Sequence, residues 1–404
     1  MQDSPTPFSL IAPRSAPPPK RSGFSWRSNQ VRGLVYQVLA LSFIAFLVWL
    51  LITNTLDNMR SRGIQSGFDF LLQPAGFDIG ENWIGYDSNH GYWKAFLTGL
   101  VNTLRVAIIG IVLTTILGTL LGIGRFSRNA LVRGICYSYV ECFRNIPVLL
   151  QLLMWYLLFT EYLPQIADAW NLRNLLFLSK NGISFPSPVW ALGHGAALVG
   201  MLVACVLAYL YAGRARQRFE QTGHAQPVLW ITLALLVGGA LVGWLLGGAP
   251  SQWDIPVKSE VQVEGGGSLT PEYMAVLLGL VLYTSAFVAE VVRGGIASVS
   301  LGQHEASASL GLSRGQSMRL VVLPQALRVI IPPMTNQFLN LTKNSSLAVA
   351  VGYPDLVSIA NTSLNQTGRA VECIAIIMAI YLTTSLLTSG FMNWFNARAA
   401  IKER

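Results

Sequence analysis

The stretch VRGGIASVSLGQHEASASLGLSRGQSMRLVVLP, residues 292–324, is a long polar interruption between two strongly apolar segments. Residues 303–310 contain no helix breaker, and Gly311 is the residue type that most readily takes the left-handed conformation at a helix end. Ser313 and Gln316 then have the Ser-x-x-Gln spacing of a capping pair that starts a new helix. The stretch therefore predicts a helix, a glycine turn and a second helix, in a loop whose flanks belong in lipid.

The composition around this loop is that of a membrane protein. Of the 404 residues, 52% are hydrophobic and 12% are charged, against about 25% charged in soluble domains. Apolar runs without charge, such as residues 33–53, 188–212 and 373–396, are long enough to cross a hydrocarbon core of about 30 Å as helices. We therefore predict an all-α, polytopic membrane protein with about eight transmembrane helices.

The net charge is +9, and the charged residues are distributed along the chain as in a membrane protein with basic loops on one side. Lys and Arg are concentrated before the first apolar run and in residues 292–324, whereas Asp and Glu are concentrated in residues 54–92 and 249–272. Because basic loops stay in the cytoplasm, the pattern predicts that both termini and residues 292–324 are cytoplasmic, and no nucleic-acid partner is expected. The proline-rich residues 1–30 are expected to form a flexible tail.

Glycines at four-residue spacing predict close helix contacts. Gly118 and Gly122 have this spacing in the second predicted span, about residues 95–124. Gly239, Gly243 and Gly247 have it in the fifth, about residues 227–248. Such spacing removes side chains from one face of a helix and lets a neighbouring helix approach.

Prolines predict two interrupted segments. Pro147 should give residues 134–160 an interfacial helix or a kinked start. The seventh membrane segment, residues 325–351, should be broken by Pro332 and Pro333 and also by the polar run from Asn340 to Ser346 near its end.

Polar side chains at membrane depth are costly, so those that remain are candidates for function. Glu290 is placed either to accept the ammonium group of a substrate or to form an i, i+3 pair with Arg293 at the interface. The polar run near the end of the seventh segment either lines a cavity or reflects Lys343 snorkelling from a helix end. The candidates for a substrate path are Glu290, Asn340, Lys343, Asn344 and Ser345.

Other ionisable residues give weaker indications. Arg105, in the second span, either attracts an anionic group or snorkels to an interface. The histidines His90, His194, His224 and His304 are scattered, and the four cysteines have no Cys-x-x-Cys spacing. We therefore predict no metal site, no disulfide framework and no cofactor.

The chain contains no Gly-Lys pair, so the phosphate-binding sequence Gly-x-x-x-x-Gly-Lys-Ser/Thr is missing. We therefore predict that the chain is not an enzyme, and that any energy for transport comes from another chain. The helix-turn-helix of residues 292–324, with Ala306 and Leu310 on one face, is suited to a groove on such a partner.

The same loop resembles a family signature. Glu305-Ala306-Ser307, then Gly311, then Leu323-Pro324 resembles the coupling-loop motif of permease subunits of bacterial ATP-binding-cassette importers, with Ser307 in place of the second alanine. The flanks are similar to the polar-amino-acid branch, above all to the first, Q-type membrane subunit of general L-amino-acid importers and of the related glutamate/glutamine/aspartate/asparagine importers. The motifs are ECFRNIPVLLQ (141–151), AEVVRGGI (289–296), LPQAL (323–327) and KNSSLAVAVGYPDL (343–356).

The resemblance implies a division of the chain. A five-helix permease core is expected in residues 95–160 and 273–404, with an extra N-terminal helix and an inserted helix pair as additions. The expected parts are a flexible cytoplasmic tail (1–30), the extra helix with a periplasmic loop (31–94), the first part of the core (95–187), the inserted pair with its periplasmic loop (188–270), and the second part of the core (271–404) with the coupling loop (294–324).

The resemblance also implies partners and roles. A second, different permease subunit, two cytoplasmic ATPases, a periplasmic amino-acid-binding protein, an L-amino-acid substrate and membrane lipid are expected. Docking to the ATPase is expected at Glu305, Ala306, Ser307, Gly311, Leu312 and Pro324. Substrate contacts are expected at Glu290, Asn340 and Asn344.

These observations predict the membrane-spanning subunit of an ATP-driven importer that moves L-amino acids across the bacterial inner membrane by alternating access. The alternative is a self-sufficient secondary transporter, which would need no ATPase partner. A membrane-anchored sensor or scaffold would need a soluble output domain, which the sequence does not indicate.

Overall fold

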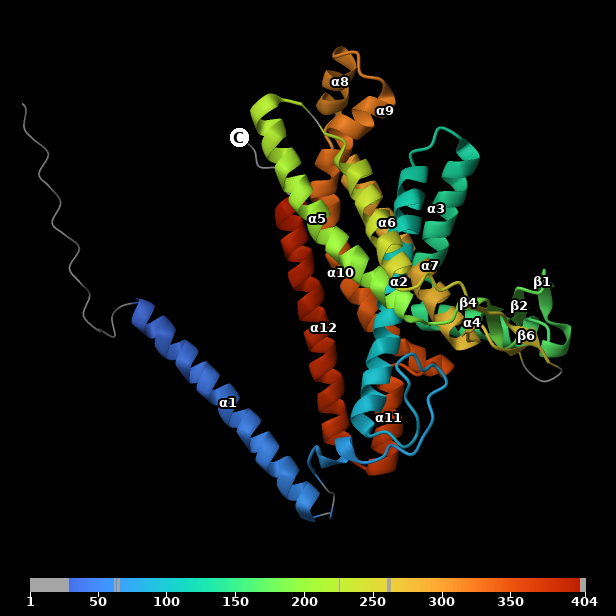
Figure 1. Ribbon diagram of the computed structural model, residues 1–404. Helices are drawn as coiled ribbons and strands as arrows, with labels where there is room; N and C mark the ends of the chain where they lie inside the picture. Colours follow the sequence, from blue (N-terminus) through green and yellow to red (C-terminus); the bar gives the residue numbers. More distant parts are fainter. Residues whose placement is uncertain (1–28, 62, 64–65, 225, 260–262, 400–404) are drawn as a thin grey trace, which may run out of the picture. The chain divides into compact units, whose positions relative to one another are not determined.

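The computed structural model describes residues 29–61, 63, 66–224, 226–259 and 263–399 (Figure 1). Met1–Ser66 and Gly67–Arg404 are separate compact units, and each is described by itself. Most of the predicted tail at residues 1–30 lies outside the described residues. In the first unit the described structure is chiefly α1 (Asn29–Ser61), whose span Arg32–Ser61 has a mean hydropathy of 2.4 and an entirely unburied apolar window.

The helices confirm the prediction of an all-α membrane protein. Six described helices are long and apolar enough to cross a membrane, and the bent pair α3 and α4 is a seventh candidate. A further helix, α10 (Leu323–Asn344), has 22 residues, which span about 33 Å at 1.5 Å per residue. The six are α1, α2 (Tyr92–Gly124), α5 (Leu192–Thr222), α6 (Val228–Leu246), α7 (Pro271–Ala297) and α12 (Ala370–Ala399).

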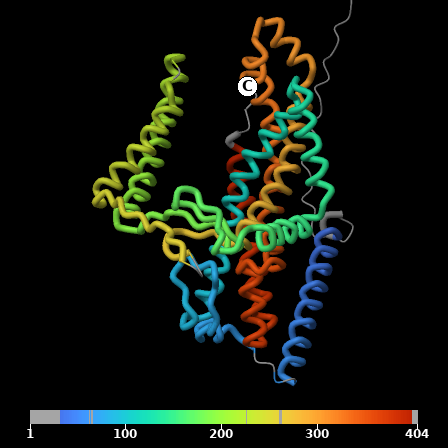
Figure 2. Tube along the Cα trace, turned by 90° about the vertical axis from the view of Figure 1, so that its right-hand side faces the viewer, coloured from blue at the N-terminus to red at the C-terminus, as the bar shows by residue number. Residues whose placement is uncertain are grey.

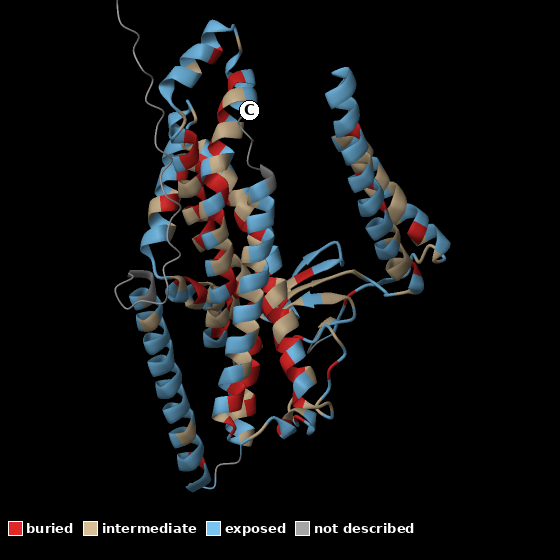
Figure 3. Ribbon diagram, turned by 90° about the vertical axis from the view of Figure 1, so that its left-hand side faces the viewer, coloured by how far each residue is buried: buried red, intermediate tan, exposed pale blue. Residues whose placement is uncertain are grey.

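The second unit is organised around α2 and α7, and buried residues are concentrated along its central helices (Figure 3). A Cβ atom on Gly118 would lie 2.5 Å from Cγ1 of Val288, and one on Gly122 would lie 2.8 Å from the carbonyl oxygen of Ala289. A larger residue at either position would push the two helices apart. The close contact predicted from the glycine spacing is therefore confirmed.

The length of α2 fixes where a membrane boundary falls. Its 33 residues span about 50 Å, whereas a hydrocarbon core is about 30 Å thick. Counting back about 20 residues from Arg125 reaches Arg105, and the same count from Arg293 in α7 reaches Tyr273. The two counts agree, because the Arg105 guanidinium lies 4.0 Å from the centre of the Tyr273 ring. The first turns of α2 therefore project beyond the core.

Glu81, on the loop before α2, joins three segments at this boundary. Its carboxylate pairs with Nη1 of Arg105 at 2.8 Å and accepts hydrogen bonds from the Thr270 hydroxyl at 2.8 Å and the Trp83 indole at 3.1 Å. The Arg105 guanidinium lies between the rings of Trp83 and Tyr273, at 4.1 and 4.0 Å. Glu81 is only 5% exposed. Arg105 thus pairs with an acid of the protein itself, at the boundary where a snorkelling side chain was expected.

The same loop is fastened at its other end to the start of α12. Arg369 donates to both carboxylate oxygens of Asp69, at 2.8 and 3.0 Å, and to the carbonyl oxygen of Gly67 at 2.7 Å. The short helices η1 (Asp69–Leu72) and α11 (Leu356–Thr367) share an apolar cluster with the first turns of α2. This part of the unit, together with the small sheet described below, is called the sheet side.

The helices α3 (Ala130–Asn145) and α4 (Val148–Leu157) meet at an angle of 103°, so that α4 runs across the unit (Figure 2). The kink predicted at Pro147 is confirmed. Nε2 of Gln151 donates to the carbonyl oxygens of Phe143 and Ile146, both at 2.9 Å. These bonds satisfy carbonyl groups that the break removes from the helical ladder. The π-helical turn η2 (Leu158–Tyr162) continues α4.

We call α5 and α6, which the sequence analysis expected to be an insertion, the inserted pair; the two helices pack on each other through small residues. A Cβ atom on Gly239 would lie 2.6 Å from the carbonyl oxygen of Gly200, and one on Gly243 would lie 2.2 Å from that of Ala196. Gly247 meets Gly193 in the same way, with a Cβ contact of 2.3 Å. The predicted packing role of the glycine series is confirmed.

Short strands, which the sequence did not predict, join the two loops that flank the inserted pair. The largest sheet has the order β1-β2-β3-β8, and β8 leads directly into the cap of α7. All pairings are antiparallel. The strands are β1 (Trp170–Leu172), β2 (Leu176–Ser179), β3 (Gly182–Phe185), β4 (Ser187–Pro188), β5 (Trp253–Asp254), β6 (Val257–Lys258), β7 (Val263–Glu264) and β8 (Gly267–Leu269).

At the opposite end of the unit, called the α8 side, α8 (Leu301–Ser309) and α9 (Arg314–Ser317) follow α7. The π-helical turn η4 (Met318–Val322) and α10 continue α9 without a break. The predicted break at Pro332 and Pro333 is wrong, because α10 runs through both prolines. Proline has a helical φ, and membrane helices tolerate it because neighbouring groups and local adjustments satisfy the carbonyl groups that it frees. The break predicted at the polar run Asn340–Ser346 is confirmed, because α10 ends at Asn344 and the 3-10 helix η5 (Ser345–Val351) begins there.

Replacing Glu81 with Gln should destabilise the sheet side, because the buried Arg105 charge would lose its counterion. Removing one partner of a buried ion pair costs about 3–5 kcal/mol. The measurement is the thermal unfolding midpoint of the purified protein in detergent. The matched control is Asp78→Asn, an exposed acid on the same loop, which should change stability by less than about 0.5 kcal/mol. Equal shifts for the two variants would contradict the role given to Glu81.

Candidate functional site

The loop from α8 to α9 has the local structure that its sequence predicts. Gly311 has φ +74°, and the N–H groups of Gly311 and Leu312 donate to the carbonyl oxygens of Ala308 (2.9 Å) and Ser307 (3.1 Å). This pair of bonds is the Schellman arrangement that ends a helix on a left-handed residue. The helix, the glycine turn and the second helix are therefore confirmed.

The start of α9 is also as predicted. The Ser313 side chain accepts from the Gln316 N–H at 3.4 Å, and the Gln316 side chain accepts from the Ser313 N–H at 2.9 Å. This reciprocal pair is a capping box. It fixes the direction in which α9 leaves the turn.

The α8–α9 loop presents apolar and charged side chains to its surroundings. Leu301 and Leu310 are 72% and 79% exposed, and Glu305 and Ala306 are also exposed. Ser307, by contrast, is 3% exposed and faces α9. The exposed surface of the loop therefore includes Glu305, Ala306 and the two leucines, while Ser307 lies behind it.

One continuous helical run, residues 314–344, connects this loop to the predicted substrate residues. We call it the α9–α10 run. Its exposed polar residues Asn336, Asn340 and Lys343 recur at i, i+4 and i+7, which places them on one face of the helix. Leu341, near the same end, packs against Gly110 of α2. A polar face at this depth must meet protein or water, because lipid tails cannot solvate it.

Glu290 lies far from the Lys343 end of α10, and its carboxylate forms ion pairs with two arginines. One oxygen pairs with Arg125 at 2.6 Å, and the other pairs with Arg293. The i, i+3 pair that the sequence offered as the alternative is therefore present. Glu290 is level with Gly122, which contacts the neighbouring Ala289, whereas Leu341 is level with Gly110. Twelve residues along α2 separate the two levels by about 18 Å.

A cavity of about 430 Å³ lies between the end of α10, α11 and α12. Its lining combines one cation, three hydroxyl groups and an apolar wall. The Tyr381 hydroxyl is buried and has no well-formed hydrogen bond among the described residues. The lining residues are Lys343, Ser346, Val357, Ile377, Tyr381, Leu382 and Ser385.

The other predicted substrate residues surround this end of α10 in different ways. Asn340 is exposed on the polar face, and Asn344 is half-buried where α10 passes into η5. Ser345 is buried, and its hydroxyl donates to the carbonyl oxygen of Thr342 at 2.7 Å. The structure thus brings Lys343 to the cavity, leaves Asn340 on the open face and gives Ser345 a local helix-ending bond.

Asp355, which the sequence reasoning missed, is a fully buried acid beside this region. One carboxylate oxygen caps α11 by accepting from the Ser358 N–H at 2.8 Å, and the other has no hydrogen bond among the described residues. Burial raises the pKa of the Asp355 carboxyl to about 7. The signal in the sequence was its position before an apolar helix, which indicates a cap but not burial.

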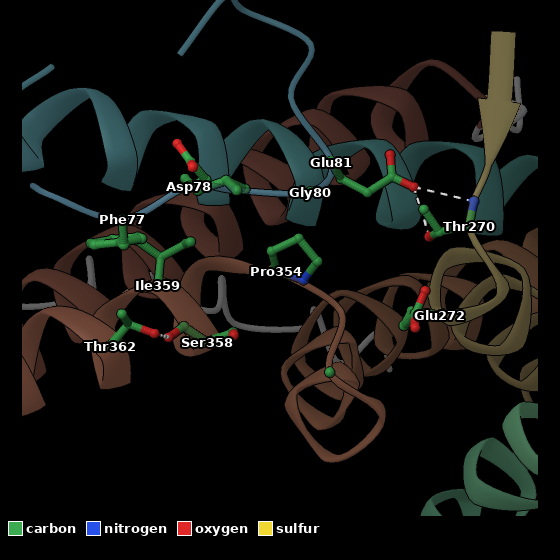
Figure 4. A pocket seen from close by; sticks show the side chains of 12 residues that line it. Phe77, Asp78, Gly80, Glu81, Thr270, Glu272, Pro354, Ser358, Ile359 and Thr362 are labelled. Atoms are coloured by element: carbon green, nitrogen blue, oxygen red, sulfur yellow. Dashed lines mark hydrogen bonds between the residues drawn. The ribbon is translucent and has the colours of Figure 1, made fainter. Parts of the chain in front are cut away.

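A second cavity, of about 410 Å³, opens on the sheet side between the loop before α2 and α11 (Figure 4). Glu81, bonded to Thr270, lies on one side, and Asp78 and Glu272 contribute further carboxylates. The sequence reasoning assigned no site here. It treated the loop as an external connection, because acids in a loop indicate only the side of the membrane.

Comparison with known proteins shows which family and which relatives this chain is similar to. The family model described as binding-protein-dependent transport system inner membrane component matches residues 196–401. The general L-amino acid transport system permease protein AapQ of Rhizobium johnstonii is 44% identical over 387 residues, which cover 95% of this chain and 97% of the relative. The glutamate/glutamine/aspartate/asparagine transport system permease protein BztB of Rhodobacter capsulatus is 37% identical over 424 residues, covering 96% and 99%.

Among solved structures, the crystal structure of an amino acid ABC transporter with histidines aligns with a TM-score of 0.45 and 22% identity. The alignment covers 76% of this chain and 95% of that one.

Apolar helices around a helix-turn-helix loop define a multi-pass membrane subunit of a transport complex. The chain belongs to the family of binding-protein-dependent transport system inner membrane components, whose members are permease subunits of ATP-binding-cassette importers. The predicted resemblance is therefore confirmed, and the alternative of a self-sufficient secondary transporter is not favoured. ATP hydrolysis belongs to a separate subunit in this family, so the chain is a transport subunit and not an enzyme.

Replacing Asp355 with Asn should stabilise the protein more at pH 8 than at pH 5. An aspartate whose pKa is raised by folding, from about 3.9 in the unfolded chain, contributes most below that value and loses its contribution as the pH rises through about 7. Asn keeps the helix cap without the charge. The gain at pH 8 should reach several kcal/mol at most, on the order of 4.

The measurement is the unfolding midpoint of both proteins as a function of pH. Asp78→Asn serves as the control, because that acid is exposed, and it should show no such pH-dependent gain. A stability difference that stays constant between pH 5 and pH 8 would contradict the burial of an ionisable Asp355.

Proposed function

We propose that this chain is the membrane-spanning subunit of an importer for L-amino acids in the bacterial inner membrane. Both full-length relatives are named for amino-acid transport, and the cavity beside Lys343 has a lining that suits an amino acid. Two separate ATPases drive the complex, and a binding protein delivers the substrate. The subunit works by alternating access, in which ATP-driven closure of the ATPases moves the α8–α9 loop.

The observation that carries this proposal is the continuity of the α9–α10 run. Its first residues belong to the exposed α8–α9 loop, and Lys343, near its last residue, lines the cavity. A continuous helix transmits displacement along its axis, because its backbone hydrogen bonds hold each turn to the next. Movement of the loop is thereby linked to the site where substrate contacts are expected.

For the ATPase contact we propose that Glu305, Ala306, Leu301 and Leu310 form the docking surface, because their side chains are exposed. Gly311 and Leu312 fix the turn through their bonds to α8, and Pro324 lies at the start of α10. These three residues hold the docking surface in its conformation without forming part of it.

For the substrate contact we propose the α10 end rather than Glu290. The Lys343 ammonium would pair with the α-carboxylate of the amino acid, which is a strong, charge-assisted contact. Asn340, Asn344 and Ser345 would border the path to it. The pairing of Glu290 with two arginines argues against a direct contact, because its negative charge is already neutralised.

For the second permease subunit we propose a position against the exposed polar face of α10. Asn336, Asn340 and Lys343 lie on that face, which lipid tails would leave unsolvated. A different permease chain facing them would enclose a polar route between the two subunits. The α8 side then faces the cytoplasm, where the ATPases are, and an even number of crossings returns both termini to that side.

Glu305→Lys should leave the subunit in the membrane but remove most of the ATPase from the purified complex, because charge reversal on the docking surface creates repulsion where a match is expected. The measurement is the ratio of ATPase to permease after affinity purification. Glu220→Lys is the control, since Glu220 is exposed at the end of α5. A full complement of ATPase with the Glu305 variant would overturn the docking assignment.

In the intact complex, vanadate and not an uncoupler should abolish uptake.

Lys343→Gln should raise the KM for amino-acid uptake by about ten- to a hundredfold, since a charge-assisted hydrogen bond contributes about 1.5–3 kcal/mol. Lys343→Arg keeps the charge and serves as the control, with a smaller change. KM and the amount of complex in the membrane are measured together. A lower amount of complex with an unchanged KM would show that Lys343 stabilises the fold and does not bind substrate.

A further inference from the structure

The helix α8 is joined to the α9–α10 run by more than the turn at Gly311. The hydroxyl groups of Ser307 on α8 and Ser317 on α9 lie 2.6 Å apart, and the two residues are 3% and 9% exposed. On the same helix, Gln303 accepts a hydrogen bond from Nε2 of Gln325 on α10 at 3.1 Å. Two side-chain hydrogen bonds therefore join α8, before the turn, to the α9–α10 run, after it.

Either serine hydroxyl can donate in this bond. The Ser307 hydroxyl also lies 2.8 Å from the carbonyl oxygen of His304, to which it can donate. Because a hydroxyl has one hydrogen to donate, Ser307 accepts from Ser317 whenever it donates to His304. Removing the Ser307 hydroxyl would leave the hydroxyl of Ser317 buried without this acceptor, whereas removing the Ser317 hydroxyl would leave the Ser307 bond to His304 intact.

The bond is a feature of this sequence and not of the general motif. The coupling-loop motif that residues 305–307 resemble has alanine at the position of Ser307, and a methyl group cannot accept a hydrogen bond. The structure here places a second serine, Ser317, within bonding distance across the turn. Both hydroxyls face the interior of the loop and lie away from the docking surface formed by Glu305 and Leu310.

We propose that the Ser307–Ser317 bond, supported by Gln303–Gln325, latches α8 to the α9–α10 run and sets the angle at which α8 meets the ATPase. The inference rests on the proposed function of the α8–α9 loop. Ser307 and Ser317 are positioning residues in this account. They keep the loop from folding at Gly311 when the ATPase moves it, so that the displacement reaches α10.

The test compares Ser307→Ala, Ser317→Ala and the double variant in the full complex reconstituted in liposomes. Each single variant should retain the ATPase on purification but hydrolyse about three- to tenfold more ATP per amino acid imported, the range expected for one net hydrogen bond. The double variant should be no worse than Ser307→Ala, because both changes remove the same bond. Ser298→Ala is the control, since the Ser298 hydroxyl also donates to a nearby carbonyl oxygen, that of Gly295 at 2.7 Å, but Ser298 caps the end of α7. Unchanged stoichiometry in the single variants would overturn the latch.

A second arm uses the double variant Ser307→Cys and Ser317→Cys. A disulfide has an S–S distance of about 2.05 Å, so two side chains whose oxygens lie 2.6 Å apart are close enough to be joined. Copper phenanthroline oxidises the two thiols, which lose two electrons and two protons as the bond forms. The oxidised complex should regain the tight coupling of the native complex, and dithiothreitol should abolish it again. Coupling that stays poor in the oxidised form would overturn the latch.

Glu305→Lys, measured in parallel, distinguishes failure of the latch from failure of the proposed function. If that variant loses the ATPase while the serine variants keep native stoichiometry, the latch is wrong and the docking surface stands. If Glu305→Lys retains the ATPase and native coupling, the docking surface itself is wrong, and the latch falls with it.

Discussion

Backbone-level contact between α2 and α7 is the constraint on which the rest of the second unit depends. It exists because glycines remove side chains where the helices meet, and the same device seats the neighbouring helices on this pair. At each such position a side chain of the incoming helix occupies the space that a Cβ would fill. The contacts are Gly118 with Val288, Gly122 with Val292, Gly99 with Ile359, Gly110 with Leu341, Gly279 with Leu152, and Gly295 with Ile330.

Ion pairs hold the two ends of this helix pair. Glu81 and Arg105 join the loop, α2 and the cap of α7 at one boundary, and Arg125 and Glu290 join α2 to α7 near the other. Charges that are neutralised in place resist separation, because parting them would leave a charge uncompensated. The α2–α7 pair is therefore suited to act as a fixed frame, and movement in a transport cycle falls to the elements that lean on it, above all α10.

Local features of the fold could be predicted from the sequence, whereas pairings between distant segments could not. The Gly311 turn, the Ser313 cap, the kink at Pro147 and the glycine contacts each depend on a few neighbouring residues. The Glu81–Arg105 pair depends on how a loop folds back on a helix, and the β3–β8 pairing joins loops on either side of an inserted helix pair. Neither leaves a periodic signal in the chain.

The candidate site shows the same division. Lys343 was found because a cation at membrane depth is costly and therefore conspicuous. Tyr381 and Asp355 were missed because a tyrosine or a capping aspartate is ordinary in a helical protein, and only packing makes them unusual. For Glu290 the local partner Arg293 was predicted as one of two alternatives, whereas the second partner, Arg125, comes from the end of α2 and was not. The proline error arose because a soluble-helix rule was applied to a membrane helix.

The π-helical turn η4 has a consequence for the orientation of α10. A π turn accommodates one more residue than an α turn, and one residue of an α-helix corresponds to a rotation of 100°. The wide turn lies between Ser317, which faces α8, and the polar face of α10. Shortening it by one residue would leave the Ser307–Ser317 contact in place but turn Gln325 and the polar face of Asn336, Asn340 and Lys343 by about 100°. The size of this single turn thus sets how the polar face of α10, where we propose that substrate binds, is rotated relative to the α8–α9 loop.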